Sequence, residues 1–161
     1  MRKKGLIKDK IDKLKEDFSF EGVYPRPLEY IANGLGYRVE YLYENTDFSG
    51  AIDYKGDVIY INANQNVRRQ IFTLAHEIGH AVLHASDAPG GEVVDYRTSM
   101  YDPNNEKEKE ANAFAAELLM PRDEFKRVWK SRNGNCLRVA DYFGVSTDAT
   151  NVRASSLRLN S

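Results

Sequence analysis

The chain has 161 residues, of which 42% are hydrophobic, so it is long enough for one domain with a real core and too short to expect two. Its one cysteine, Cys136, excludes an internal disulfide framework and fits a reducing compartment. No apolar run follows the first four residues and no long apolar window occurs, so the sequence predicts neither a signal peptide nor a membrane span. We therefore expect a cytoplasmic protein. Basic residues are in excess in 1–17 and 122–161, around an acidic middle that argues against nucleic acid lying across it.

The first part of the chain predicts two helices followed by a small sheet. Apolar residues recur at helical spacing from Leu6 to Phe18, and a second, short helix from Leu28 to Gly34 has proline at its start. Three strand candidates follow, Tyr37–Tyr43, Gly50–Tyr54 and Val58–Asn62. Because only a short turn around Lys55-Gly56 joins the last two, we expect a hairpin, and hence a small, mostly antiparallel three-stranded sheet.

A long helix from about Val67 to His84, capped by Asn64 or Asn66, carries the motif His-Glu-x-x-His. On a helix His80 lies only about 40° from His76 and one turn further along, so both imidazoles point the same way. If the two imidazoles bind a metal ion, Glu77 lies close enough to reach a water on that ion without being a ligand itself. Two neutral nitrogen ligands and one carboxylate that accepts a proton are what a catalytic zinc site requires. The structural alternative is a pair of histidines satisfied within an amphipathic helix.

A second helix is predicted from about Glu106 to Leu119, ended by Pro121. On its helical wheel Glu108 is the one carboxylate on the apolar side, with Asn112 one turn later, whereas Glu106, Glu110 and Glu117 lie on the opposite side. A buried carboxylate is costly unless it is paired, and a bound cation is one remedy. Glu108 is therefore a candidate third metal ligand, and the alternative is a salt bridge to Arg68 or Arg69.

The segment between these helices and the C-terminal end are less specific. Residues 85–105 lack periodicity, and because long loops in compact domains are usually functional, we place substrate contacts there, with Tyr96 and Tyr101 as candidates. Three more helices are predicted at Arg122–Arg132, Leu137–Ser146 and Thr147–Leu157, the last two in a helix-turn-helix outline. With Arg153 and Arg158 as its only cations, the last helix favours packing over DNA binding.

Two blocks of sequence resemble the ImmA/IrrE family of metallopeptidases: Arg69 to Ala75 followed by His76-Glu77-Ile-Gly79-His80, and Glu108 to Pro121. The resemblance implies an α+β fold in which the sheet packs on a zincin-like helical core, and a gluzincin-like site. In such a site His76, His80 and Glu108 hold one zinc ion and Glu77 is the general base. It also implies a protease of a phage, mobile element or stress response that cleaves a helix-turn-helix repressor.

The residues suggest the same organisation and leave several roles open. We expect one domain over 1–161, made of helices and sheet (1–66), active-site helices (67–121) and a C-terminal helical part (122–161). Asn112, His84, Tyr96 and Tyr101 are candidates to support a ligand or to stabilise the transition state. Two histidines and a carboxylate also accept Mn²⁺ or Fe²⁺.

The competing hypothesis is a non-catalytic regulatory protein that binds DNA or a repressor and keeps a structural or vestigial metal site. Glu77 speaks against it, because a structural site has no use for a base beside an open coordination position.

Overall fold

The computed structural model describes residues 2–87, 93–95 and 105–160. Its helices are α1 (Arg2–Phe18), α2 (Leu28–Gly34), α3 (Val67–Leu83), the short 3-10 helix η1 (Ala85–Asp87), α4 (Glu106–Leu119), α5 (Arg122–Ser131), α6 (Cys136–Phe143) and α7 (Thr147–Ser156). Its strands are β1 (Arg38–Leu42), β2 (Gly50–Asp53), β3 (Val58–Asn62) and β4 (Val93–Asp95). Every predicted helix is confirmed to within a few residues at its ends. None of the helices in the described parts of the chain is both long and apolar enough to cross a membrane.

The sheet is mixed, with strand order β1-β3-β2-β4, so the prediction of a mostly antiparallel three-stranded sheet is wrong. The expected hairpin is present, since β2 runs antiparallel to β3. However, β1 runs parallel to β3, with Val39 opposite Ile59, and β4 pairs with β2 inside the segment expected to be a loop. The parallel pairing arises because the chain between β1 and β2 crosses to the far side of β3 before it returns.

Two asparagine side chains hold that crossing segment in place. The Asn62 amide donates to the carbonyl oxygens of Thr46 and Phe48, and the Asn64 amide donates to those of Tyr43 and Glu44. Backbone carbonyls that no strand pairs are thereby satisfied by side chains. The end of β3 therefore fixes where β2 begins.

Asparagine side chains also begin the two central helices. Asn66 Oδ1 accepts from the Arg68 backbone N–H at 2.9 Å, which selects Asn66 over Asn64 as the cap of α3. Asn105 caps α4 in the same way by accepting from Glu108 N. Each cap satisfies an N–H group that has no partner within its helix. The caps set where along each helix the polar site residues fall.

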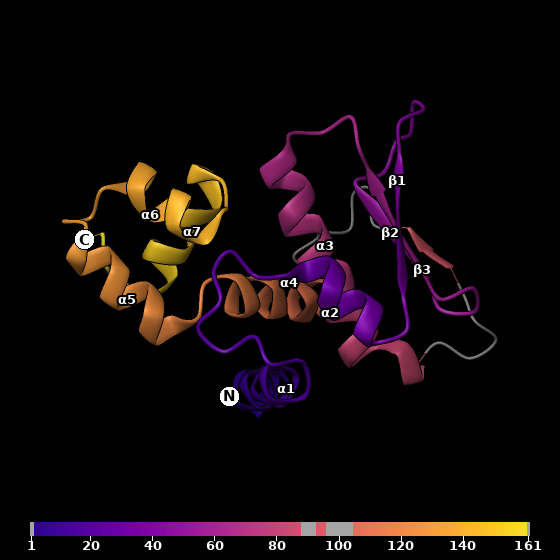
Figure 1. Cartoon of the computed structure of the whole chain (residues 1–161), viewed down its shortest axis with the longest axis horizontal. Coiled ribbons are helices and arrows are strands. Elements are labelled where there is room, and N and C mark those ends of the chain that lie inside the picture. Colours follow the sequence, from indigo (N-terminus) through magenta and orange to yellow (C-terminus); the bar gives the residue numbers. More distant parts are fainter. Residues whose placement is uncertain (1, 88–92, 96–104, 161) are drawn as a thin grey trace.

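Helices α3 and α4 form the centre of the molecule, between the sheet at one end and α5–α7 at the other, with α1 alongside α4 (Figure 1). The two helices approach closely at Gly79. A Cβ atom there would lie 3.1 Å from Phe114 Cδ1 and 3.2 Å from the Ala111 carbonyl oxygen. The core on either side is continuous and includes the fully buried residues Ile31, Ile59, Ile78, Phe114, Leu118, Phe125 and Phe143.

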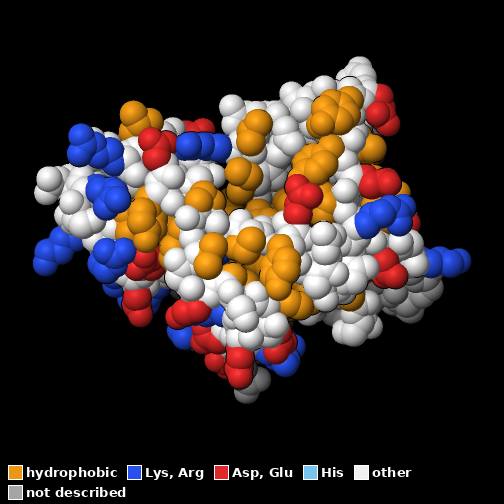
Figure 2. Space-filling view, viewed as in Figure 1, with side chains coloured by type: hydrophobic (Ala, Val, Ile, Leu, Met, Phe, Trp, Pro, Cys, Tyr) orange, Lys and Arg blue, Asp and Glu red, His pale blue; other side chains and the backbone are white. Residues whose placement is uncertain are grey.

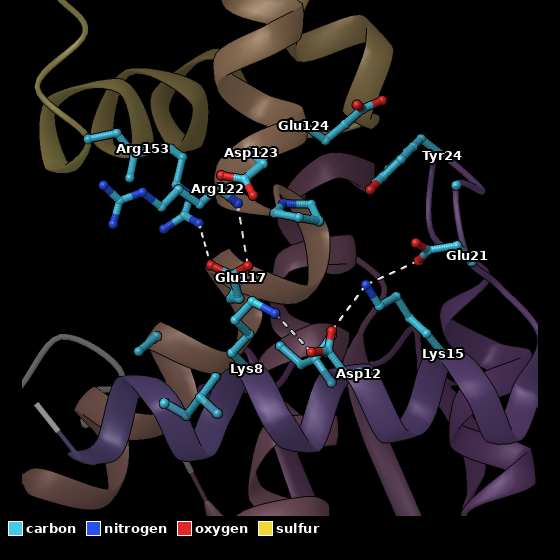
Figure 3. Close-up of a pocket in the computed structure, with 17 residues that line it drawn as sticks. Lys8, Asp12, Lys15, Glu21, Tyr24, Glu117, Arg122, Asp123, Glu124 and Arg153 are labelled. Atoms are coloured by element: carbon cyan, nitrogen blue, oxygen red, sulfur yellow. Dashed lines mark hydrogen bonds and ion pairs between the residues drawn. The ribbon is translucent and has the colours of Figure 1, made fainter.

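The C-terminal helices are tied to the centre by arginines. Arg153 of α7 donates to the Met120 carbonyl oxygen at 2.9 Å and pairs with Glu117 of α4 at 2.8 Å. These contacts lie beside a groove of about 680 Å³ that α1, the end of α4, α5 and α7 line (Figure 3). On the face shown in Figure 2, Lys and Arg side chains over α5–α7 are interspersed with Asp and Glu. Arg153, one of the only two cations that the last helix could offer to nucleic acid, is thus engaged within the protein.

Candidate metal centre

His76 and His80 of α3 meet Glu108 of α4 at the contact between the two helices. His76 Nε2 lies 3.0 Å from Glu108 Oε1, and His80 Nε2 lies 3.0 Å from Glu108 Oε2. The two Nε2 atoms are 3.1 Å apart. All three side chains are buried, and one ligand atom from each lies within 4.8 Å of the others. The helical spacing predicted this convergence for the histidines, and the wheel of α4 predicted it for Glu108.

The contact of His76 with Asn112 orients its ring so that Nε2 faces Glu108. Its Nδ1 lies 2.8 Å from Asn112 Oδ1, one turn after Glu108 on α4, where Asn112 was expected to support the site. An amide oxygen only accepts, so the imidazole hydrogen belongs on Nδ1 and the lone pair of Nε2 faces Glu108. Helix α4 therefore supplies both the carboxylate and the group that orients a histidine of α3.

His80 is neutral at pH 7. Burial lowers its pKa from the ordinary 6.5 to about 4, even though Glu108 favours the protonated form. A neutral imidazole carries one hydrogen, so one of its two nitrogens presents a lone pair. The burial of His80 thus favours the form that binds a metal.

The donor set fits a divalent cation. Lone pairs of two imidazole nitrogens and a carboxylate that stand 3.0–3.1 Å apart repel one another unless a hydrogen or a cation lies between them. Ligands held about 2.0–2.1 Å from zinc in a tetrahedron are themselves about 3.3 Å apart, close to the spacing seen here. Salt bridges to the two arginines were the alternative. Arg68 instead contacts Asp141 and the Val145 carbonyl, and Arg69 contacts Gln65 and Ser49.

Glu77 is also fully buried, beside the start of β2. A Cβ atom on Gly50 would lie 2.9 Å from Glu77 Oε2 and 2.5 Å from Thr73 Cγ2. Only a residue without a side chain fits between the strand and this carboxylate. Gly50 therefore leaves the space that Glu77 occupies, a role that the sequence pattern alone did not reveal.

Two further side chains continue the site beyond His80. His84 Nδ1 lies 2.8 Å from His80 Nδ1, and His84 Nε2 lies 2.8 Å from Glu110 Oε1. His84 was a candidate, whereas Glu110 was placed on the side of α4 opposite Glu108, and its contact with His84 was not predicted. The wheel gives directions from the axis of α4 only, and it does not say where the end of α3 passes. Tyr96 and Tyr101 lie outside the described residues.

A buried His-His-Glu cluster beside a second glutamate is an arrangement that zinc-dependent peptidases use. Residues 34–155 match the model of the Peptidase_M78 family, described as the IrrE N-terminal-like domain, and the chain belongs to this family. Membership supports a metallopeptidase-type function.

Two curated proteins are similar over part of the chain. It is 38% identical over 78 residues to the radiation response metalloprotease IrrE of Deinococcus radiodurans, covering 45% of this chain and 22% of that protein. It is 36% identical over 69 residues to uncharacterized immunity region protein 2 of Bacillus phage phi105, covering 43% of this chain and 41% of that protein. The chain thus spans less than half the length of each.

A solved structure is similar over most of the chain. A Mycobacterium tuberculosis transcriptional regulator superposes with a TM-score of 0.63 at 18% identity, covering 91% of this chain and 46% of that one. At this identity the similarity concerns the fold alone.

Proposed function

We propose that the protein is a zinc-dependent endopeptidase in which His76, His80 and Glu108 hold the metal and Glu77 is the general base. The convergence of two imidazole nitrogens and a carboxylate within 3.1 Å of one another, in a buried site, carries the proposal. Three protein ligands leave a fourth position for water or substrate, as in catalytic zinc sites. Family membership supports the same conclusion.

When bound, zinc lowers the pKa of a water molecule and polarises the peptide carbonyl. Glu77, one residue after His76, takes a proton from the attacking water and returns it to the leaving amine. Its burial between α3 and β2 excludes bulk water from the carboxylate, which strengthens its electrostatic interactions with the reacting groups. Asn112 holds His76 in the tautomer that presents Nε2.

The proposed substrate is a helix-turn-helix transcriptional repressor of a phage, mobile element or stress response. One relative is named for a phage immunity region and another for a radiation response, and both names concern regulated gene programmes. The acidic surplus of residues 18–121 suits a basic protein partner, as DNA-binding repressors are.

The test combines metal analysis with a cleavage assay. Protein purified without chelators or a histidine tag should contain about one zinc per chain. If the reading frame beside its gene encodes a helix-turn-helix repressor, the protein should cleave that repressor, whereas Glu77→Gln should keep the zinc and leave the repressor intact. Zinc binding with repressor binding but no cleavage would instead support the regulatory protein. A wild type that binds no metal, even after zinc is added and the excess removed, would contradict the proposed site.

A further inference from the structure

The two proposed histidine ligands are supported differently. His76 is held by the neutral amide of Asn112, whereas His80 contacts a second imidazole that is backed by a carboxylate. The chain of contacts runs from His80 Nδ1 to His84 Nδ1, and from His84 Nε2 to Glu110 Oε1, with both distances 2.8 Å. His84 is 4% exposed, and the Glu110 side chain is 15% exposed. This is a buried polar chain that the catalytic roles described above do not use.

When His80 binds a metal through Nε2, each imidazole hydrogen along the series His80–His84–Glu110 has only one possible position. A ligand Nε2 on His80 carries no hydrogen, so the hydrogen is on Nδ1 and is donated to His84 Nδ1. His84 then carries its own hydrogen on Nε2 and donates it to the Glu110 carboxylate, which only accepts. The other tautomer of His80 would place a hydrogen on Nε2, where the metal binds. Through His84, the Glu110 carboxylate thus selects the tautomer of His80.

We propose that His84 and Glu110 are positioning residues that hold His80 in its ligand tautomer and orientation and make it a stronger zinc donor. The inference rests on the proposed metal site and extends it to residues that touch neither metal nor substrate. A carboxylate behind a ligand histidine raises its basicity, and loss of such a partner typically costs about 10–100-fold in metal affinity. His84 follows His80 by one turn of α3, and Glu110 comes from α4, so the contact also joins the two helices.

The test measures the zinc dissociation constant by competition with a chelator for four variants. Glu110→Gln keeps the size of the side chain and removes its charge, and we expect about 10-fold weaker binding. His84→Asn keeps an acceptor near the Nδ1 position but loses the link to Glu110, so it should weaken binding by a similar factor. His84→Ala loses both and should approach 100-fold. The matched control is Glu106→Gln, an exposed glutamate of the same helix, whose affinity should equal that of the wild type.

Two further measurements separate a positioning role from a purely structural one. The double variant His84→Asn/Glu110→Gln should bind zinc no more weakly than either single variant, because both break one contact chain. Cobalt-loaded Glu110→Gln should show a shifted visible absorption spectrum, while cobalt-loaded Glu106→Gln should not.

Wild-type affinity in Glu110→Gln, within about twofold, would overturn the inference even if its metal-free form melts at a lower temperature. Full additivity of the two single variants would overturn it as well. A wild type that binds no zinc would contradict the metal site itself, and that outcome is distinct from a bound metal that is indifferent to Glu110.

Discussion

Two of the four glutamates of helix α4 have surroundings that differ in kind. Glu117, at one end, meets the Arg153 guanidinium, so its negative charge is balanced inside the protein. Glu108, near the other end, meets two imidazole nitrogens, one of them on a residue that burial keeps neutral. The first arrangement is complete as it stands and ties α7 to the centre. The second brings lone pairs face to face, which a bound cation would relieve.

One end of α4 therefore has a structural role, and the other end carries the candidate metal site. Around Glu117, the Arg153 guanidinium of α7 and the Arg122 backbone N–H of α5 both contact this carboxylate of α4, beside the groove of Figure 3. Around Glu108, polar groups of α3 and α4 converge on a point. A buried charged residue alone therefore does not indicate a metal site. The convergence of several lone-pair-bearing nitrogen and oxygen atoms does.

The largest expected effect is the loss of cleavage in Glu77→Gln. Removing a general base typically costs about 10²–10⁴-fold in turnover. Zinc content should remain at the wild-type value, because Glu77 lies beside the proposed ligands and is not one of them. Turnover is measured on a helix-turn-helix repressor that the wild type cleaves. A rate near that of the wild type would remove Glu77 from the mechanism.

Glu108→Ala should weaken zinc binding by more than about 100-fold, beyond the range for residues that only support a ligand. Glu106→Ala is the matched control on the same helix, because Glu106 is exposed and pairs only with Lys109 among the contacts described for it. Glu110→Ala is unsuitable as a control because Glu110 contacts His84. Zinc content after dialysis gives the readout, and equal loss in both variants would place the metal elsewhere.

Gly50→Ala should lower the free energy of unfolding by about 1–3 kcal/mol, because its Cβ would overlap Thr73 and crowd the Glu77 carboxylate. Cleavage should fall as Glu77 shifts. Gly5→Ala is the control, since nothing lies within 4 Å of a Cβ at that position in α1. Urea unfolding of both variants measures the difference. Wild-type stability together with wild-type cleavage would show that β2 does not confine Glu77.

Arg153→Ala should destabilise the protein by about 1–3 kcal/mol, because it leaves the Met120 carbonyl and Glu117 without their guanidinium partner. Zinc affinity should not change, which distinguishes this region from the Glu108 region. The exposed Arg158 gives the comparison variant, Arg158→Ala, with no expected loss. A fall in zinc affinity in Arg153→Ala would mean that the two ends of α4 are coupled.

A last effect, which appears only below neutral pH, concerns the acid stability of the metal-free protein. Burial lowers the pKa of His80 to about 4, so the unfolded chain takes up a proton below about 6.5 and the folded chain does so only near 4. Stability therefore falls as the pH decreases through this window. We expect the melting temperature to fall by roughly 10 °C across it, and by less in His80→Gln. Equal pH dependence in both proteins would assign the effect to other groups.

The sequence predicted what local patterns determine and missed what depends on distant segments. The ends of α3 and α4 follow from caps and Pro121, and the hairpin from a turn in which Asp53 accepts backbone N–H bonds. The parallel pairing of β1 with β3 depends on the amides of Asn62 and Asn64 reaching back to the crossing segment, and no local pattern records this. The division of 1–161 into three parts within one domain stays a prediction.

The candidate site shows the same division. His76 and His80 were predictable because four residues make about one helical turn, and Glu108 because it interrupts an apolar face. The place of Glu110 beside His84 depends on how two helices cross, which neither helix specifies alone. Gly50 was missed because a glycine reports the space it leaves only when its neighbour is known.

Gly79 sets how closely the two helices that carry the site approach each other. Its missing side chain lets α3 approach the Ala111–Phe114 stretch of α4, one residue before His80 and three residues after Glu108. Metal–ligand bond lengths are fixed to within about 0.2 Å, so ligands on two helices are usable only if the helices stand at one separation. A side chain at position 79 would push α3 and α4 apart. The separation of the two helices therefore sets the distance between the proposed ligands, and a single added methyl group would change it.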